Sequence, residues 1–355
     1  MSKKTDKTKE DLLRNLKPPG AYLDSLTNFD DLIGTIRQAE NAANELIDET
    51  APVKSANETG LATSVSTTEA TEVTAKNAEE KVPTVEELLE TLDKLIGLDN
   101  IKQSVRSLIN LVKVRKLREE NDLPNPPMSL HMVFTGNPGT GKTTVARILS
   151  ELYRGIGVLS KGQLVEVDRG GLVAGFVGQT AIKTKEVVDS ALGGILFIDE
   201  AYSLAPEIGT GNDFGREAIE TLLKMMEDHR KDLIVIVAGY SEPMERFIMS
   251  NPGLESRFNR YFSFEDYNGD ELNEIFLSIC AKSEYIMTDE ARAFASEHFQ
   301  LMYAMRDENF GNARYVRNFF ENIVSVHSDR ISALNEHTRE DLMTITLEDL
   351  EESML

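Results

Sequence analysis

A glycine-rich segment, GNPGTGKT at residues 136–143, has the residue types and spacing of a phosphate-binding loop. It fits G-x-x-x-x-G-K-[ST], follows the apolar run LHMVFT and precedes the helix-forming segment TVARILSELY. Glycines let successive backbone N–H groups turn towards one anion, and a following helix adds the positive end of its dipole. Lys142 is expected to reach the β- and γ-phosphates of a nucleoside triphosphate, and Thr143 to bind Mg²⁺. The expected phosphate-binding residues are Gly136, Asn137, Pro138, Gly139, Thr140, Gly141, Lys142, Thr143 and Thr144.

An acidic pair ends a second apolar run, GGILFIDE at residues 193–200. Neighbouring residues of a strand point to opposite faces, so Asp199 and Glu200 can have different tasks. We expect Asp199 to lie near the Mg²⁺ ion and Glu200 to act as the general base that polarises an attacking water. A base aimed at water predicts hydrolysis of the triphosphate, and it has no use in a small-molecule kinase.

Hydrolysis also needs positive charge on the transferring γ-phosphate, and an arginine often supplies it. The segment NPGLESRFNRYFSF offers Arg257 and Arg260, and GNARYVRNFF places Arg314 near the start of a predicted helix. An isolated arginine is more often a solvated or ion-paired surface residue. Spacing alone therefore does not assign the role to any of the three.

Strand and helix patterns predict how these motifs are positioned. Between residues 84 and 268, five β-rich runs (LHMVFTG, QLVEV, GGILFID, LIVIVAG and RYFSF) alternate with helical segments. This alternation predicts an α/β domain with five buried strands in a parallel sheet covered by helices on both faces. Residues 269–355 show only helical stretches and predict a small all-α domain, with the acidic segment 347–355 as a frayed helix end.

The N-terminal part of the chain has a different texture. Residues 1–49 include one candidate amphipathic helix at 22–49, although a partly ordered tail is an equal alternative. Residues 50–83 are rich in Thr, Ala, Ser and Glu, and their apolar area is too small to offset the entropy of ordering. We therefore expect a flexible linker there.

Composition restricts the possible partners and the compartment. The 355 residues carry 60 acidic and 38 basic side chains, a net charge of −22, which disfavours nucleic acid and anionic membranes as partners. The single cysteine, Cys280, excludes an internal disulfide framework. The N-terminal residues lack the apolar run of a signal peptide, and no apolar stretch is long enough for membrane insertion. These features predict a cytoplasmic protein.

Taken together, the motifs resemble the AAA+ ATPases over residues 84–353. The similarity is greatest to the branch that contains red-type Rubisco activase, stage V sporulation protein K and the cytosolic ATPase of type VII secretion. It rests on HMVFTGNPGTGKTTVARIL, GFVGQTAIKTKEVVDSALGGILFIDEAYSL, AGYSEPMERFIMSNPGLESRF and GNARYVRN. The resemblance implies a P-loop AAA+ domain with a helical lid, ATP and Mg²⁺ as cofactors, and a homo-oligomeric ring, usually a hexamer, with ATP held between neighbouring subunits.

The resemblance also implies roles for single residues. Arg257 corresponds by position to the arginine finger that a neighbouring subunit supplies, with Arg260 as a second candidate. Arg314 corresponds to the sensor that reaches the γ-phosphate from the lid. Tyr240, in VAGY, stands where many members carry Asn or Thr, and we expect it to orient the water together with Glu200.

Two further segments acquire a role in the same way. LIGLDNIK is similar to the segment that packs on adenine, which implies a base contact from Ile96, Gly97 and Leu98. GLVAGFVGQ is similar to a pore loop of the aromatic–hydrophobic–glycine type that grips a polypeptide, which implies this role for Phe176, Val177 and Gly178. A Phe176 ring buried in the core is the alternative. Lys183 and Lys185, in the helix that follows, are predicted to form part of a solvated helix face.

The sequence therefore predicts an ATP-hydrolysing ring motor that pulls on, or pries apart, a protein client of unknown identity. One alternative is a scaffold or switch that assembles on ATP with little turnover. Glu200 and Arg257 argue against it, because a pure switch needs neither. A nucleic-acid-linked AAA+ protein is a weaker alternative, given the acidic charge and no evident DNA-binding appendage.

Overall fold

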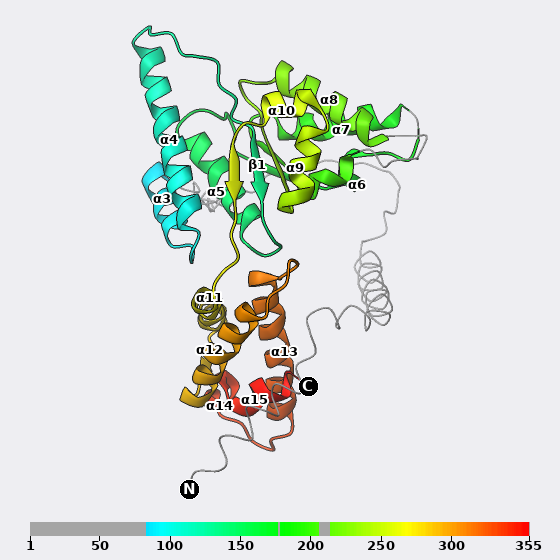
Figure 1. Ribbon diagram of the computed structural model, residues 1–355. Coiled ribbons are helices and arrows are strands. Elements are labelled where there is room, and N and C mark those ends of the chain that lie inside the picture. Colours follow the sequence, from blue (N-terminus) through cyan, green and yellow to red (C-terminus); the bar gives the residue numbers. More distant parts are fainter. Residues whose placement is uncertain (1–82, 177, 206–213, 355) are drawn as a thin grey trace, which may run out of the picture. The chain divides into compact units, whose positions relative to one another are not determined.

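The computed structural model describes residues 83–176, 178–205 and 214–354 (Figure 1). The expected N-terminal amphipathic helix, the linker up to residue 82 and Val177 lie outside the described residues. The unit Val82–Leu355 contains all the motifs of the predicted nucleotide site.

Five strands form one sheet in the order β2-β3-β4-β1-β5, and every neighbouring pair is parallel. The predicted five-stranded parallel sheet is thereby confirmed. Because strands that neighbour each other in space do not follow each other in sequence, the connecting helices cross over the sheet. The strands are β1 (Met132–Thr135), β2 (Leu164–Val167), β3 (Ile195–Ile198), β4 (Ile234–Gly239) and β5 (Tyr261–Ser263).

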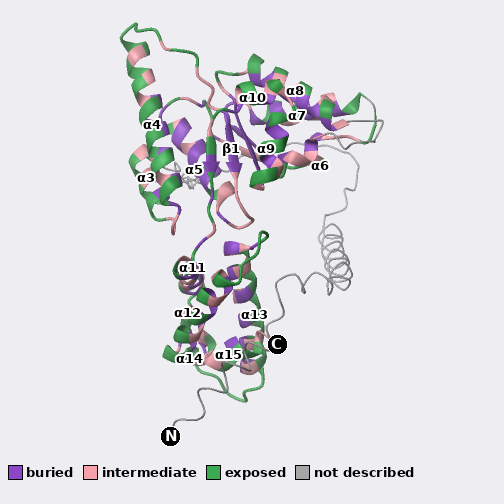
Figure 2. Ribbon diagram, viewed as in Figure 1, coloured by how far each residue is buried: buried purple, intermediate pink, exposed green. Residues whose placement is uncertain are grey.

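Helices cover both faces of this sheet, as predicted. Side chains of β1 alternate between two apolar clusters, with Phe134 in one cluster and Val133 in the other. Figure 1 shows one group of helices on each side of the strands, and Figure 2 shows the buried residues concentrated between them. One face carries α3 (Val85–Asp93), α4 (Asp99–Glu120) and α5 (Lys142–Gly155), and the other carries α7 (Gln179–Ala191), α8 (Phe214–Asp228), α9 (Ser241–Met249) and α10 (Pro252–Arg257).

The two edge strands are less buried than the sequence predicted. Strand β2 is only partly buried, and in β5 both Tyr261 and Ser263 are exposed. The central strands β3 and β4 are buried along their whole length. Five buried strands were expected from the apolar runs, but an edge strand has a neighbour on one side alone.

Side-chain caps explain where two helices around the site begin. Thr84 and Glu87 form a capping box at the start of α3, and Asn268 and Glu271 form another at α11 (Gly269–Lys282). In each box the two side chains satisfy backbone N–H groups that the first helical turn leaves without partners. Helix α11 therefore starts two residues after Tyr267, at the joint between the α/β domain and the lid.

The lid after this joint is helical, as predicted, with a core of aromatic rings. The ring of Phe276 lies 5.4 Å from that of Phe299 and 5.8 Å from that of Phe319. Two strands of two residues each, β6 (Ile286–Met287) and β7 (Thr344–Ile345), pair in parallel, which the sequence did not predict. The other lid helices are α12 (Asp289–Ala304), α13 (Asn312–Ser332), α14 (Arg339–Met343) and α15 (Leu347–Glu352).

The acidic C-terminal segment is anchored, so its interpretation as a frayed helix end was wrong. Thr346 and Asp349 cap α15, and Asp349 is 1% exposed. The Arg330 guanidinium donates to both carboxylate oxygens of Asp349, at 2.7 and 2.8 Å. A bidentate pair of this kind is strong and directional, and it fixes α15 against α13.

A buried histidine connects the neighbouring strands β1 and β4. His131 precedes β1, and its Nδ1 accepts a hydrogen bond from the Val235 N–H of β4 at 3.0 Å. Burial, with a smaller contribution from the nearby Arg257 charge, lowers the pKa of His131 to about 4. The imidazole is therefore neutral near pH 7, as a ring nitrogen that accepts a hydrogen bond requires.

This pKa predicts a loss of stability in acid. The pKa of His131 is lower in the folded than in the unfolded state, so its contribution is present above pH 6.5 and is lost as the pH falls to about 4. His131→Asn keeps an acceptor for Val235 but does not titrate. Over this pH window, the unfolding free energy of the wild type, measured by chemical denaturation, should fall by about 3 kcal/mol more than that of His131→Asn. His337→Asn, at an exposed site, is the control, and equal pH slopes for wild type and His131→Asn would contradict the prediction.

Candidate active site

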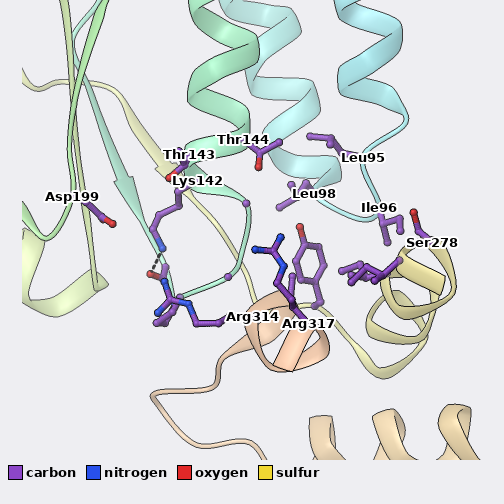
Figure 3. Close-up of a pocket in the computed structure, with 18 of the residues that line it drawn as sticks. Leu95, Ile96, Leu98, Lys142, Thr143, Thr144, Asp199, Ser278, Arg314 and Arg317 are labelled. Atoms are coloured by element: carbon purple, nitrogen blue, oxygen red, sulfur yellow. Dashed lines mark hydrogen bonds between the residues drawn. The ribbon is translucent and has the colours of Figure 1, made fainter. Parts of the chain in front are cut away.

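A pocket of about 530 Å³ lies at the carboxyl ends of β1, β3 and β4 and is bounded by lid helices α11 and α13. Ligands of open parallel sheets bind at this edge. Figure 3 shows Lys142 and Asp199 at one end of the pocket and Leu95, Ile96 and Ser278 at the other. The pocket therefore has a charged end and an end with apolar side chains.

The glycine-rich loop forms the charged end and is followed directly by α5. The Lys142 ammonium donates to the backbone carbonyls of Gly136, at 2.8 Å, and Asn137, at 2.7 Å. Two predicted loop residues support the loop without lining the pocket: the buried Thr140 hydroxyl donates to the Asn137 carbonyl, and the Asn137 amide donates to Asp266. The predicted residues that line the pocket are Gly136, Pro138, Gly139, Gly141, Lys142, Thr143 and Thr144.

Burial lowers the pKa of Lys142 to about 8. The nearby Arg314 charge acts in the same direction, whereas Asp199 and Asp266 oppose it. A lysine in this state gains from any added negative charge, because an anion beside the ammonium favours the protonated form. The loop is therefore suited to bind phosphate.

Three predicted residues come together where the central strands end. Asp199 and Glu200 follow β3, Tyr240 follows β4, and all of them line the pocket. The Glu200 N–H donates to the Asp199 carboxylate at 3.0 Å, and Glu200 has a positive φ of 46°. A non-glycine residue rarely adopts this backbone conformation, which here turns the chain at the pocket directly after β3.

The Tyr202 side chain contacts that of Glu200, and the sequence analysis did not identify Tyr202 as a site residue. Its pKa is raised to about 12 by burial first, then by the charges of Glu200 and its neighbours and by a hydrogen bond to the Glu200 side chain. The Tyr202 and Tyr240 ring centroids are 6.3 Å apart. A Cβ atom at Gly239 would lie 2.7 Å from the Tyr202 ring, so glycine is required for this approach. Nothing in the segment DEAY signals that contact.

The lid contributes cations to the same pocket. Arg314 lies in the first turn of α13, as predicted, and Arg317 follows it by one turn. Both line the pocket (Figure 3). The helical spacing of three residues could have revealed Arg317, which the sequence analysis did not single out.

The other end of the pocket is lined mainly by apolar side chains. Of the predicted base contacts, Ile96 and Leu98 line it, whereas Gly97 packs against Glu271 and Tyr267. Ile275 and Ile279 of α11 complete the apolar wall. Apolar walls with a few polar groups are typical of cofactor pockets.

The two finger candidates lie away from the pocket of their own chain. Neither Arg257 nor Arg260 is among the described residues that line it. The Arg257 side chain is 28% exposed and lies 3.6 Å from the Glu227 carboxylate. The Arg260 Nε donates to the Ser129 carbonyl at 3.0 Å. Neither arginine is positioned to act on a nucleotide bound in the same chain.

The predicted pore loop leads into α7. Phe176 is 71% exposed, which does not fit the alternative of a ring buried in the core, and Gly178 caps α7 with a positive φ of 79°. The Lys183 ammonium donates to the carbonyls of Gly170, at 2.6 Å, and Val173, at 3.1 Å. Lys183 therefore anchors the base of the loop, and its interpretation as part of a solvated face was wrong. Lys185 is exposed, as predicted.

The donor set of the charged end fits Mg²⁺. The described residues contain no group of three or more His, Cys, Asp or Glu side chains placed to hold a metal ion. Thr143 and Asp199 offer a hydroxyl and a carboxylate at the pocket. Mg²⁺ is commonly held by one or two such oxygen ligands together with substrate phosphates, so no protein cage is needed.

Helices long and apolar enough to cross a bilayer are absent from the part of the chain that the structure describes.

Comparisons with known proteins agree with this geometry. Residues 132–266 match the ATPase family associated with various cellular activities (AAA), and residues 268–354 match the AAA lid domain. Stage V sporulation protein K of Bacillus subtilis (strain 168) is 41% identical over 253 residues, which cover 71% of this chain and 78% of that protein.

Two further relatives have similar sequence identity to this chain. Protein CbxX (chromosomal) of Cupriavidus necator is 43% identical over 70% of this chain and 78% of its own length. The chloroplastic ribulose bisphosphate carboxylase/oxygenase activase of Cyanidioschyzon merolae is 42% identical over 72% of this chain and 87% of its own length. With the phosphate loop, acidic pair and helical lid in place, the chain belongs to the AAA family of ATPases.

Proposed function

We propose that this ATPase works as a homo-oligomeric ring, most simply a hexamer, in which ATP lies between neighbouring subunits and its hydrolysis remodels a protein client. The observation that carries the proposal is the split of the site. The pocket of one chain is lined by the phosphate loop, the acidic pair and Arg314. Arg257 of the same chain lies outside this pocket. A neighbouring copy can bring that arginine to the pocket.

Within one subunit, each group has a distinct task. The loop amides and Lys142 bind the β- and γ-phosphates, and the apolar wall holds adenine. Thr143 and Asp199 would hold Mg²⁺, which when bound neutralises charge on the phosphate oxygens. Glu200 accepts a proton from the attacking water, and Tyr240 beside it helps to orient that water.

The remaining charge on the transition state comes from arginine. Arg314 approaches from the lid of the same subunit, and Arg257 approaches from the neighbour. The present ion pair of Arg257 with Glu227 has both partners partly exposed, and such pairs are weak enough to exchange for a phosphate contact. Arg260 is the poorer candidate because its Nε donates to the Ser129 carbonyl at 3.0 Å, whereas the bond from Arg257 to the Gly253 carbonyl is longer, at 3.3 Å.

The client is a polypeptide that the pore loop grips. The exposed Phe176 ring stands on a loop whose base is fixed by Lys183 and whose end turns at Gly178. A ring of such apolar side chains can contact many sequences, because the contact does not depend on hydrogen-bond complementarity. The names of the relatives point to sporulation and to Rubisco activation, so they leave the client open.

The first prediction concerns the general base. Glu200→Gln should retain ATP affinity but lower steady-state phosphate release by about a hundredfold or more, because the amide cannot accept the proton of water. The exposed lid variant Glu297→Gln is the matched control and should hydrolyse ATP as the wild type does. Wild-type turnover in Glu200→Gln would show that another group is the base.

A second prediction concerns the pKa of Lys142. Because the ammonium is partly deprotonated above pH 8 and phosphate favours its charged form, nucleotide binding there should take up protons, and affinity should weaken as the pH rises. Calorimetry in buffers of different ionisation enthalpy measures that uptake. Lys142→Arg remains charged, so it should bind the nucleotide more weakly and without proton uptake. Equal uptake by both proteins would assign the proton to a different group.

A third prediction separates ATP hydrolysis from binding of the polypeptide client. Phe176→Ala should leave basal ATP turnover within about twofold of wild type and weaken binding of a fluorescent, permanently unfolded polypeptide about tenfold in the ATP state. The control Leu334→Ala removes an exposed apolar side chain from the lid and should change neither quantity. Unchanged polypeptide binding by Phe176→Ala would remove the pore-loop role.

A further inference from the structure

A fully buried asparagine lies at the joint between the phosphate loop and the lid. Asn312 is the first residue of α13 and is 0% exposed. Its φ of 49° is positive, in the left-handed region. Asn312 stands two residues before Arg314, so any force on its side chain acts directly on the turn that carries that arginine.

The Asn312 amide is fully used in hydrogen bonds. Its oxygen accepts from the Tyr267 N–H at 2.9 Å. Its nitrogen donates to the Asp266 carboxylate at 2.7 Å, to the Phe310 carbonyl at 3.0 Å and, more weakly, to the Pro138 carbonyl at 3.4 Å. One side chain thus joins the start of α13 to the segment between β5 and α11 and to the phosphate loop.

Asp266 extends the same network. Its carboxylate also accepts from the Asn137 amide of the phosphate loop, at 2.9 Å, and lies 3.7 Å from the Arg306 Nε of the lid. Asn312 at the centre of this network is fully buried and has its amide satisfied, and polar networks satisfied in this way are rigid. The phosphate loop, the joint and the lid are therefore held in one relative arrangement.

Backbone contacts at Gly139 show how close this arrangement is. The Ala313 N–H donates to the Gly139 carbonyl at 3.2 Å. A Cβ atom at Gly139 would lie 2.3 Å from the Gly311 carbonyl oxygen and 2.6 Å from the Arg314 nitrogen. The first turn of α13 thus lies directly against the loop that receives the phosphates.

Few residue types could replace Asn312. The left-handed conformation favours glycine, asparagine and aspartate. Glycine has no side chain to form the four hydrogen bonds. Aspartate would accept from Tyr267, but it has no N–H to donate and would add a charge beside Asp266. Asparagine alone meets both the backbone and the hydrogen-bonding requirement.

We propose that Asn312 is a positioning residue for ATP hydrolysis, which holds the first turn of α13 on the phosphate loop and thereby directs Arg314 at the γ-phosphate. This rests on the role proposed above for Arg314. Because the same amide also bonds the joint at Tyr267, a shift of the loop on hydrolysis is transmitted to the lid through Asn312 and Asp266.

A double-mutant cycle in the full-length chain tests the proposal. Asn312→Gly keeps the favoured backbone conformation and removes the amide. It should lower kcat about tenfold in the wild-type background but less than about twofold in the Arg314→Ala background, because both changes remove the same function. Asn318→Gly, at an exposed position of α13, is the matched control and should leave kcat unchanged.

The possible outcomes are distinct. An equal fold-loss of kcat in both backgrounds, or no loss in the wild-type background, overturns the positioning role while leaving the ATPase mechanism intact. If Arg314→Ala hydrolyses ATP at the wild-type rate, the role of Arg314 in the proposed function is wrong, and so is the positioning role of Asn312. If Asn312→Gly does not fold, as judged by thermal unfolding, Asp266→Ala, which removes the carboxylate that accepts from the Asn312 amide, replaces it in the same cycle with the same expected pattern.

Discussion

Phosphate chemistry in this protein depends on the parallel arrangement of three central strands. Because β3, β4 and β1 are neighbours and run in the same direction, their carboxyl ends meet at one edge of the sheet. The acidic pair, Tyr240 and the phosphate loop follow these ends directly. Strand β4 lies between the other two, so Tyr240 is placed between the loop and the acids. A change in strand order would separate these groups even if every motif were retained.

Charge in the pocket is the reverse of charge in the chain. The whole sequence carries a net charge of −22, yet Lys142, Arg314 and Arg317 line one pocket. Local cations in a concave site attract and orient an anion despite an acidic surface elsewhere. The lid supplies two of these cations, so the position of the lid determines the field that a triphosphate experiences.

Local patterns in the sequence predicted much of this architecture. The glycine-rich loop, the acidic pair and the five strands are contiguous segments whose residue spacing determines their conformation, and the structure places them as expected. Contacts between distant segments were not predictable in the same way. Asn312 reaches Asp266 and Tyr267 across more than forty residues, and Tyr202 meets Gly239 and Tyr240 across more than thirty. The prediction of burial was wrong for the two edge strands of the sheet. Lys183 was predicted to be solvated because its acceptors are backbone carbonyls, which no residue type in the sequence reveals.

The central claim is that two subunits complete one hydrolytic site, and a mixing experiment tests it most directly. Glu200→Gln lacks the base and Arg257→Ala lacks the finger, so each variant alone should be almost inactive. In a mixed ring, an Arg257→Ala subunit with an intact base can meet a Glu200→Gln neighbour with an intact finger. ATP turnover should therefore reappear when the two variants are mixed, assembled with nucleotide and assayed for phosphate release. Turnover that stays at the sum of the separate variants, although mixed rings form, would contradict the shared site.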